Sequence, residues 1–266
     1  FMLRTGNAGS ITTFSNIAML LSVLISWLLI RSCFQPKTEG EIHWRIMKPM
    51  SAGTMFRFFI LAYGGMMVGS LIVALFSALV PGGFDTPDFS PSSDLLGNIL
   101  LVITTVIAAP LFEEYLFRGV CMMGLKRYGN GFAILVTSFL FAFMHGNVPQ
   151  AVPIFFFSLV LCYVDIRTDS LLPGLIFHIA NNAISQMMLF IQNEAILALF
   201  GLFVLVIIIA AVVIFILELQ KKERIQAELK SPYDFRFSAF FNNWASITLL
   251  VLLIVMMAIN ILAPLT

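Results

Sequence analysis

Long apolar runs separated by short polar segments make up almost the whole chain. An α-helix rises 1.5 Å per residue, so about 20 apolar residues cross a hydrocarbon core of about 30 Å. The runs and the breaks between them predict eight membrane-spanning helices, two of which are short. The predicted spans are Ser10–Ile30, Phe56–Val80, Leu95–Lys126, Gly131–His145, Ala151–Val164, Leu171–Phe190, Ala195–Leu217 and Phe240–Leu262.

Turn-forming residues mark the connections between these spans. Pro81–Asp94 is rich in Pro, Gly and Ser, Gly129 predicts a tight turn, and Gly-Asn-Val-Pro-Gln at 146–150 ends the fourth span. Pro110 predicts a kink inside the third span. We find no internal repeat and no linker to a soluble module. We therefore expect residues 1–266 to form one all-α integral-membrane domain, a polytopic bundle of about eight transmembrane helices.

Composition and charge agree with this picture and exclude some partners. Hydrophobic side chains make up 60% of the chain and charged ones 11%, which is far from a soluble domain. The net charge of +1 excludes a nucleic-acid partner. Lysine and arginine concentrate in the connections after the first, third, fifth and seventh spans, which predicts a multi-pass plasma-membrane protein with those connections in the cytoplasm. Residues 221–236 mix charge with Ile225 and Leu229, which fits a surface helix or a solvated connection.

The first candidate for chemistry is the stretch Glu-Glu-Tyr-Leu-Phe-Arg at 113–118, directly after an uncharged run. Ionisable groups at membrane depth are costly and are functional candidates by default. A helix turns about 100° per residue, so Glu114 and Arg118 share a face and can pair, while Glu113 points about a quarter turn away. Glu113 is then free to act as a general base. Taken alone, the stretch also fits an ion-paired helix end at the lipid headgroups.

Two of the three histidines lie within predicted spans. Glu113 and His145 are each sixteen positions from Gly129, so a hairpin turning there places them at about the same depth. His178 and Asn182 are four residues apart, and both can donate hydrogen bonds toward one point. A lone membrane histidine more often bonds between helices than catalyses. Polar groups on three spans instead favour one shared site.

The three patterns together resemble a known family. Glu-Glu-x-x-x-Arg at 113–118, Phe-x-x-x-His at 141–145 and His-x-x-x-Asn at 178–182 are similar to the signatures of the CAAX protease and bacteriocin-processing family of intramembrane glutamate proteases, which is related to the type II CAAX prenyl endopeptidases. The resemblance covers a motif-bearing core at about residues 95–190. It implies a hydrolase that cleaves peptide bonds in or near the membrane.

The resemblance also implies residue roles. The implied catalytic residues are Glu113, His145, His178 and Asn182. Glu113 and His145 would activate a water molecule, and the other two would stabilise the oxyanion. Glu114 and Arg118 would form a supporting ion pair. The short loops and compact motif spacing look like the bacterial branch, so we expect a bacterial peptide or membrane-associated precursor as substrate and membrane lipid as surroundings.

Several alternatives remain open at the level of the sequence. Two histidines and a carboxylate could bind zinc in a metalloprotease, although there is no His-Glu-x-x-His pattern. Cys33, Cys121 and Cys162 have no metal-type spacing and predict no disulfide framework. A non-proteolytic protein for bacteriocin immunity or membrane scaffolding would fit the same resemblance, and a proton-relaying transporter is a third reading. We expect no cofactor, and the oligomeric state stays open.

Overall fold

A computed structural model gives the architecture of the chain. It describes residues 8–33, 43–80, 83–84, 89–91, 93–230 and 244–262. These residues form helices and no strand, which confirms the predicted all-α membrane bundle. Asp85, Asp88, Arg236 and the start of the eighth predicted span at Phe240 lie outside the described residues.

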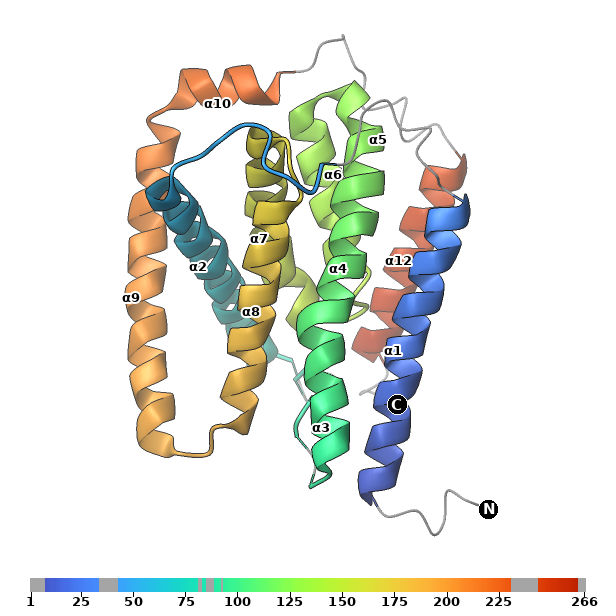
Figure 1. Cartoon of the computed structure of the whole chain (residues 1–266). Coiled ribbons are helices and arrows are strands. Elements are labelled where there is room, and N and C mark those ends of the chain that lie inside the picture. Colours follow the sequence, from blue (N-terminus) through green and yellow to red (C-terminus); the bar gives the residue numbers. More distant parts are fainter. Residues whose placement is uncertain are drawn as a thin grey trace.

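The helices follow the predicted apolar runs closely (Figure 1). Five segments are long and apolar enough to cross a membrane: Thr13–Ser32, Ala52–Ser77, Leu95–Tyr128, Val148–Thr168 and Glu194–Leu219. The bundle helices around the third segment are α1 (Ala8–Cys33), α2 (Ala52–Ser77), α6 (Asn130–Phe143), α7 (Val148–Thr168), α8 (Leu172–Phe190), α9 (Glu194–Leu219) and α12 (Trp244–Leu262). A shorter helix, α10, covers Lys222–Leu229.

The third segment is a continuous helix with two widened stretches. It contains α3 (Leu95–Val102), α4 (Ala109–Glu113) and α5 (Met123–Leu125), with π-helical turns at Ile103–Ala108 and Glu114–Met122. Pro110 does not break the helix as a simple kink would, because it follows a stretch already bonded from residue i to i−5. π-helical turns are rare and frequently occur at functional sites. Both glutamates of the acidic motif lie where α4 meets the second stretch.

The connections with basic residues gather at one end of the bundle, the upper end in Figure 1. The backbone N–H of Lys48 donates to the carbonyl of Thr168 at 2.9 Å. Lys126 pairs with Asp169 at 4.0 Å, and Asn130 donates to the carbonyl of Glu228 at 2.8 Å. These contacts join the connections after α1, α5, α7 and α9. The alternation predicted from the charge pattern is therefore the topology of the fold.

The opposite end of the bundle is tied by Asp94. This residue caps the start of α3, where its carboxylate accepts the backbone N–H of Gly97 at 2.9 Å. The hydroxyl of Thr13 in α1 donates to the same carboxylate. The hydrogen bonds from Thr13 and from the Gly97 N–H lower the pKa of Asp94. One acidic side chain thereby ends the connection before α3 and joins α3 to α1.

The small residues of α2 let other helices approach its backbone. Gly64 faces Ala211 of α9, and Gly69 faces the backbone of Pro153 in α7. Their partners belong to the same chain, and they bring α2 against the helices on both sides of it. The main buried core lies beside them, with Phe58 of α2, Phe157 of α7 and Phe177 of α8.

We expect Gly69→Val to destabilise the fold by about 1–3 kcal/mol. A Cβ atom at position 69 would lie 2.7 Å from the Cα of Pro153, and backbone atoms cannot move aside as a flexible side chain can. Thermal unfolding in detergent measures the effect. Gly53→Val in the same helix is the control, because a Cβ at Gly53 has nothing within 4 Å. Equal melting temperatures for the two variants would show that the α2–α7 approach is not tight.

Two predicted boundaries were wrong. His145 lies just past the end of α6 rather than inside a helix, because Gly146 takes a positive φ of 71° and Asn147 caps the next helix by accepting the Gln150 N–H. The predicted fifth span, Ala151–Val164, was too short at both ends. Helix α7 runs through Asp165 to Thr168, because Asp165 is a buried helix residue and not part of a polar connection.

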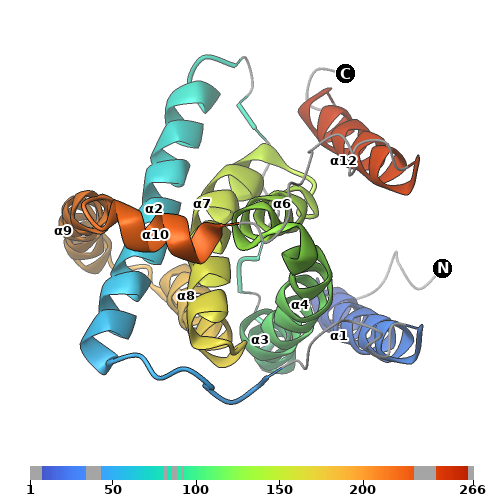
Figure 2. The ribbon, with the colours of Figure 1, turned by 90° about the horizontal axis from the view of Figure 1, so that it is seen from above.

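The basic segment after α9 is a helix over the part that the structure describes. Helix α10 lies across the upper end of the bundle and reaches from α9 toward α6 (Figure 2). Ile225 and Leu229 turn toward the bundle, while Lys222 and Gln226 are exposed. Of the two readings left open by the sequence, the surface helix is the one observed.

Candidate functional site

The centre of the candidate site is a buried ion pair on the third segment. The Arg118 guanidinium and the Glu114 carboxylate are 3.2 Å apart, and both side chains are fully buried. Arg118 also donates to the hydroxyl of Ser158 in α7 at 2.8 Å. The pairing predicted from the i, i+4 spacing is therefore present. It lies inside the bundle, so the alternative of a helix end at the lipid headgroups was wrong.

His178 of α8 lies between the two glutamates. Its Nδ1 is 2.7 Å from Glu114 Oε1, and its Nε2 is 3.6 Å from Glu113 Oε2. A carboxylate only accepts, so the short contact places a proton on Nδ1. Glu114 fixes the ring with this bond and has no exposed surface, whereas the Glu113 side chain is 16% exposed. Glu113 is therefore the carboxylate that an outside molecule can reach.

The ring of Phe141 joins the second histidine to this cluster. It contacts the His145 ring with centroids 5.2 Å apart and the His178 ring at 5.7 Å, both edge to face. The guanidinium of Arg118 stacks on the same ring, 4.2 Å from its centroid. His145 Nδ1 donates to the Phe141 carbonyl at 2.9 Å, which leaves the Nε2 lone pair of the neutral ring available as an acceptor.

Asn182 has a partner that the sequence did not predict. Its side-chain amide donates to the backbone carbonyl of Thr105 at 2.8 Å. In this π-helical stretch the N–H of Ala109 bonds to the carbonyl of Thr104, five residues back. The next donor in that series would serve Thr105, but it is Pro110, which has no N–H. Asn182 thus bonds the carbonyl that Pro110 leaves open, and one hydrogen of its amide remains for another acceptor.

Asp165 sets the position of α8 and was missed in the sequence. Its carboxylate is fully buried and accepts the N–H of Gly174 at 2.8 Å, in the first turn of α8. A Cβ at position 174 would meet this carboxylate at 2.5 Å, so glycine is needed there. His178 follows one turn later. In the sequence, Asp165 begins a short polar run after the apolar run Ala151–Val164, and this pattern does not indicate that its side chain points inward.

We expect Asp165→Ala to lower both stability and any activity that depends on His178. Leaving the first turn of α8 uncapped costs about 0.5–2 kcal/mol by comparison with ordinary N-caps. Asp165→Asn is the control, because its side-chain oxygen can still accept from Gly174. Thermal melts of the two variants separate the effects. If asparagine destabilised the protein as much as alanine, the negative charge rather than the hydrogen bond would be the stabilising feature.

The structure therefore brings Glu113, Glu114, Arg118 and His178 into direct contact, and it links His145 to them through Phe141. Asn182 lies one helical turn beyond His178 on α8 and bonds to the backbone of the third segment. Within the described ranges, no three His, Cys, Asp or Glu side chains are arranged to hold a metal ion. Cys121 and Cys162 are free thiols.

Comparison with known proteins returned one family. No curated protein and no solved structure matches the chain. The part of the chain that matches this family contains all three motifs and ends just past Asn182, and the flanking helices lie outside it. Residues 95–184 match the family of type II CAAX prenyl endopeptidase Rce1-like proteins, which confirms the resemblance found in the sequence.

Proposed function

We propose that the chain is an intramembrane endopeptidase of the CAAX type and that it hydrolyses a peptide bond near the membrane. The observation that carries the proposal is the contact of His178 with both Glu113 and Glu114 inside a membrane bundle. Two adjacent carboxylates have different environments there. Glu114 is buried and bonded to Arg118 and His178, while Glu113 is partly exposed. One has a positioning role, and the other can meet substrate.

In this mechanism Glu113 is the general base. It takes a proton from water while the water oxygen attacks the carbonyl carbon of the peptide bond. The Nε2 lone pair of His145 accepts the second water hydrogen as a hydrogen bond and orients the attack. When the tetrahedral intermediate collapses, the C–N bond breaks and the proton on Glu113 passes to the leaving amine. The carboxylate is thereby restored.

His178 and Asn182 stabilise the oxygen that becomes negative. In its protonated form His178 has two N–H groups, one bonded to Glu114 and the other available at Nε2. The second amide hydrogen of Asn182 adds a donor, because the first is used on Thr105. Fixed donors in a water-poor site stabilise a developing oxyanion more than water does. The ion pair of Glu114 with Arg118 keeps the His178 ring in place.

The proposed substrate is a peptide or a membrane-associated precursor that approaches from the cytoplasm. His178 lies seven residues from Leu171, about 10 Å of helix from the end that carries the basic connections. By the positive-inside rule this end is cytoplasmic. The family description names prenyl endopeptidases, so prenylated CAAX peptides are one class to test. Leader-bearing bacterial peptides are the other.

A cleavage assay tests the proposal. Purified protein in detergent is incubated with a prenylated CAAX peptide and with an unmodified peptide, and mass spectrometry maps the products. We expect a defined cut whose rate does not change with a chelator. Loss of cleavage that added zinc restores would replace this mechanism with a metalloprotease. Failure to cut any peptide, by a protein that still protects cells against a bacteriocin, would favour an immunity or scaffold role.

A further inference from the structure

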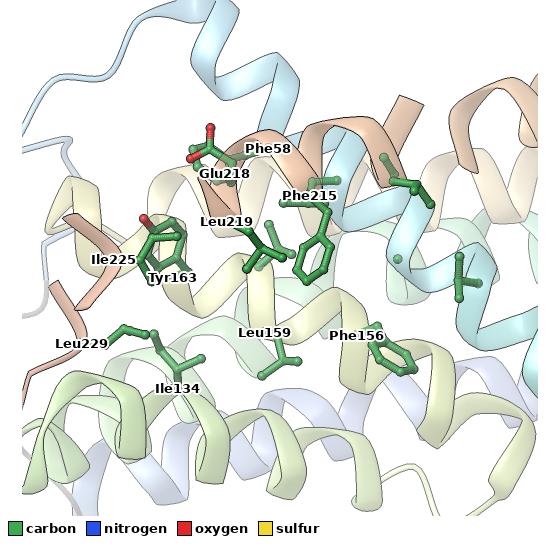
Figure 3. Close-up of a pocket in the computed structure, with 16 residues that line it drawn as sticks. Phe58, Ile134, Phe156, Leu159, Tyr163, Phe215, Glu218, Leu219, Ile225 and Leu229 are labelled. Carbon is green, nitrogen blue, oxygen red and sulfur yellow. The ribbon is translucent and has the colours of Figure 1, made fainter. Parts of the chain in front are cut away.

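An apolar groove lies on the face of α7 that points away from the candidate site. Its volume is about 510 Å³, within the range of ligand pockets. Phe58 of α2, Val160 of α7 and Val212 of α9 line it, and α10 closes one end with Ile225 (Figure 3). The residues of α7 that contact the candidate site are different ones: Phe157 packs against His178, and Ser158 accepts from Arg118. The groove is therefore a separate feature.

The side chains that line the groove are almost all apolar. Two polar side chains reach its edge, and both are already bonded. The hydroxyl of Tyr163 donates to Glu228 at 2.6 Å, and the carboxylate of Glu218 accepts from Lys221 and Arg224 at 2.5 and 2.8 Å. An occupant of the groove itself must then be an apolar chain.

The groove is open to the surrounding bilayer along α9. Phe215 and Leu219 line it and are 52% and 53% exposed, so its outer wall is incomplete. Helix α9 packs close to α2 at Gly64 and Ala211, which leaves the space beside α7 unfilled. A chain from a lipid in the same leaflet can enter sideways without crossing a polar barrier.

The closed end of the groove has excess positive charge. Three cations, Lys221, Arg224 and Arg167, pair with only two carboxylates, Glu218 and Glu228. On α10 itself, Glu223 is offset by the adjacent Lys222. One positive charge is therefore left over at the level of α10, which lies across the end of the bundle (Figures 1 and 2). Basic residues at a membrane surface attract anionic headgroups by about 1 kcal/mol each.

We propose that this groove binds one acyl chain of an anionic phospholipid, with the lipid phosphate against the basic end formed by α10 and its neighbours. The apolar lining accepts the chain, the gap along α9 admits it, and the unbalanced charge selects the headgroup. The bound lipid fills the space between α7 and α9 beneath α10. The site is independent of the catalytic proposal, since it uses none of its residues.

Native mass spectrometry of the purified, delipidated protein tests this proposal. Phosphatidylglycerol and phosphatidylcholine with the same chains are added separately. One unbalanced charge predicts about fivefold stronger binding of phosphatidylglycerol. Val212→Trp fills the groove and should reduce binding about tenfold, a loss of about 1.4 kcal/mol. Val213→Trp is the matched control: Val212 is 48% and Val213 51% exposed, and only Val212 lines the groove.

Two results would overturn the proposal. Equal binding of the two lipids would show that the site does not recognise the anionic headgroup. Equal binding by the two tryptophan variants would show that the lipid does not bind in the groove. A second measurement needs no variant. Phosphatidylglycerol with a photoreactive acyl chain is cross-linked to the wild-type protein, and adducts are expected on Val160, Phe215 and Ile225. Adducts confined to the outer face of α1 would place the lipid elsewhere.

Discussion

Glu113→Gln is expected to lower the rate of peptide cleavage by about 10²- to 10⁴-fold, the usual contribution of a general base. Glutamine has the size of glutamate but cannot take the proton of the attacking water. Substrate binding should change little, so the loss is expected in kcat rather than KM. Initial rates measured over a range of peptide concentrations separate the two constants.

The control for this variant is Glu223→Gln on α10, where the carboxylate is exposed and far from the motif in sequence. It should cleave at the wild-type rate. Thermal melts should show Glu113→Gln folded, because the Glu113 contact with His178 is long at 3.6 Å. Full cleavage by a folded Glu113→Gln protein would disprove its role as the base. If Glu113→Gln lost cleavage but cells that carry it kept their immunity to a bacteriocin, a binding function would be favoured instead.

Most of the fold could be predicted because apolar runs determine where membrane helices can lie. The positions of the basic residues predicted which connections lie at the same end of the bundle. Contacts between those connections, such as Lys126 with Asp169, agree with this prediction. The π-helical turns could not be predicted, since they depend on hydrogen-bond registers that composition does not reveal. The length of α7 was missed for a related reason: the partner of Asp165 is a backbone N–H nine residues away.

The candidate site was predictable where its contacts are local. Glu114 and Arg118 are four residues apart, so helical geometry alone gave their pairing. The contact of Glu114 with His178 joins residues 64 positions apart, and no spacing rule predicts it. The same holds for Phe141, which the motif gives only as the residue four positions before His145. Its ring separates the two imidazoles and also stacks on Arg118.

The ion pair of Glu114 with Arg118 is better explained by site geometry than by stability. Burying two charges costs several kcal/mol per ion, and their attraction repays this only if the remaining polar atoms are also bonded. Among the described groups, Glu114 Oε2 and Arg118 Nε have no hydrogen-bond partner. A pair of apolar side chains would fill the same space at lower cost. The pair does, however, hold the carboxylate that fixes His178.

Arg118→Met is therefore expected to destabilise the protein by about 3–5 kcal/mol, because it leaves the Glu114 carboxylate buried without its cation. The double variant Glu114→Gln with Arg118→Met should recover much of this stability but not cleavage, since glutamine does not hold His178 as a carboxylate does. Lys126→Met is the matched control: Lys126 lies at the end of the same segment, and its partly exposed pair with Asp169 is worth at most about 1 kcal/mol. Thermal melts with parallel cleavage assays measure both quantities. If the double variant were as unstable as Arg118→Met, the guanidinium would stabilise the bundle through Ser158 and Phe141 rather than through Glu114.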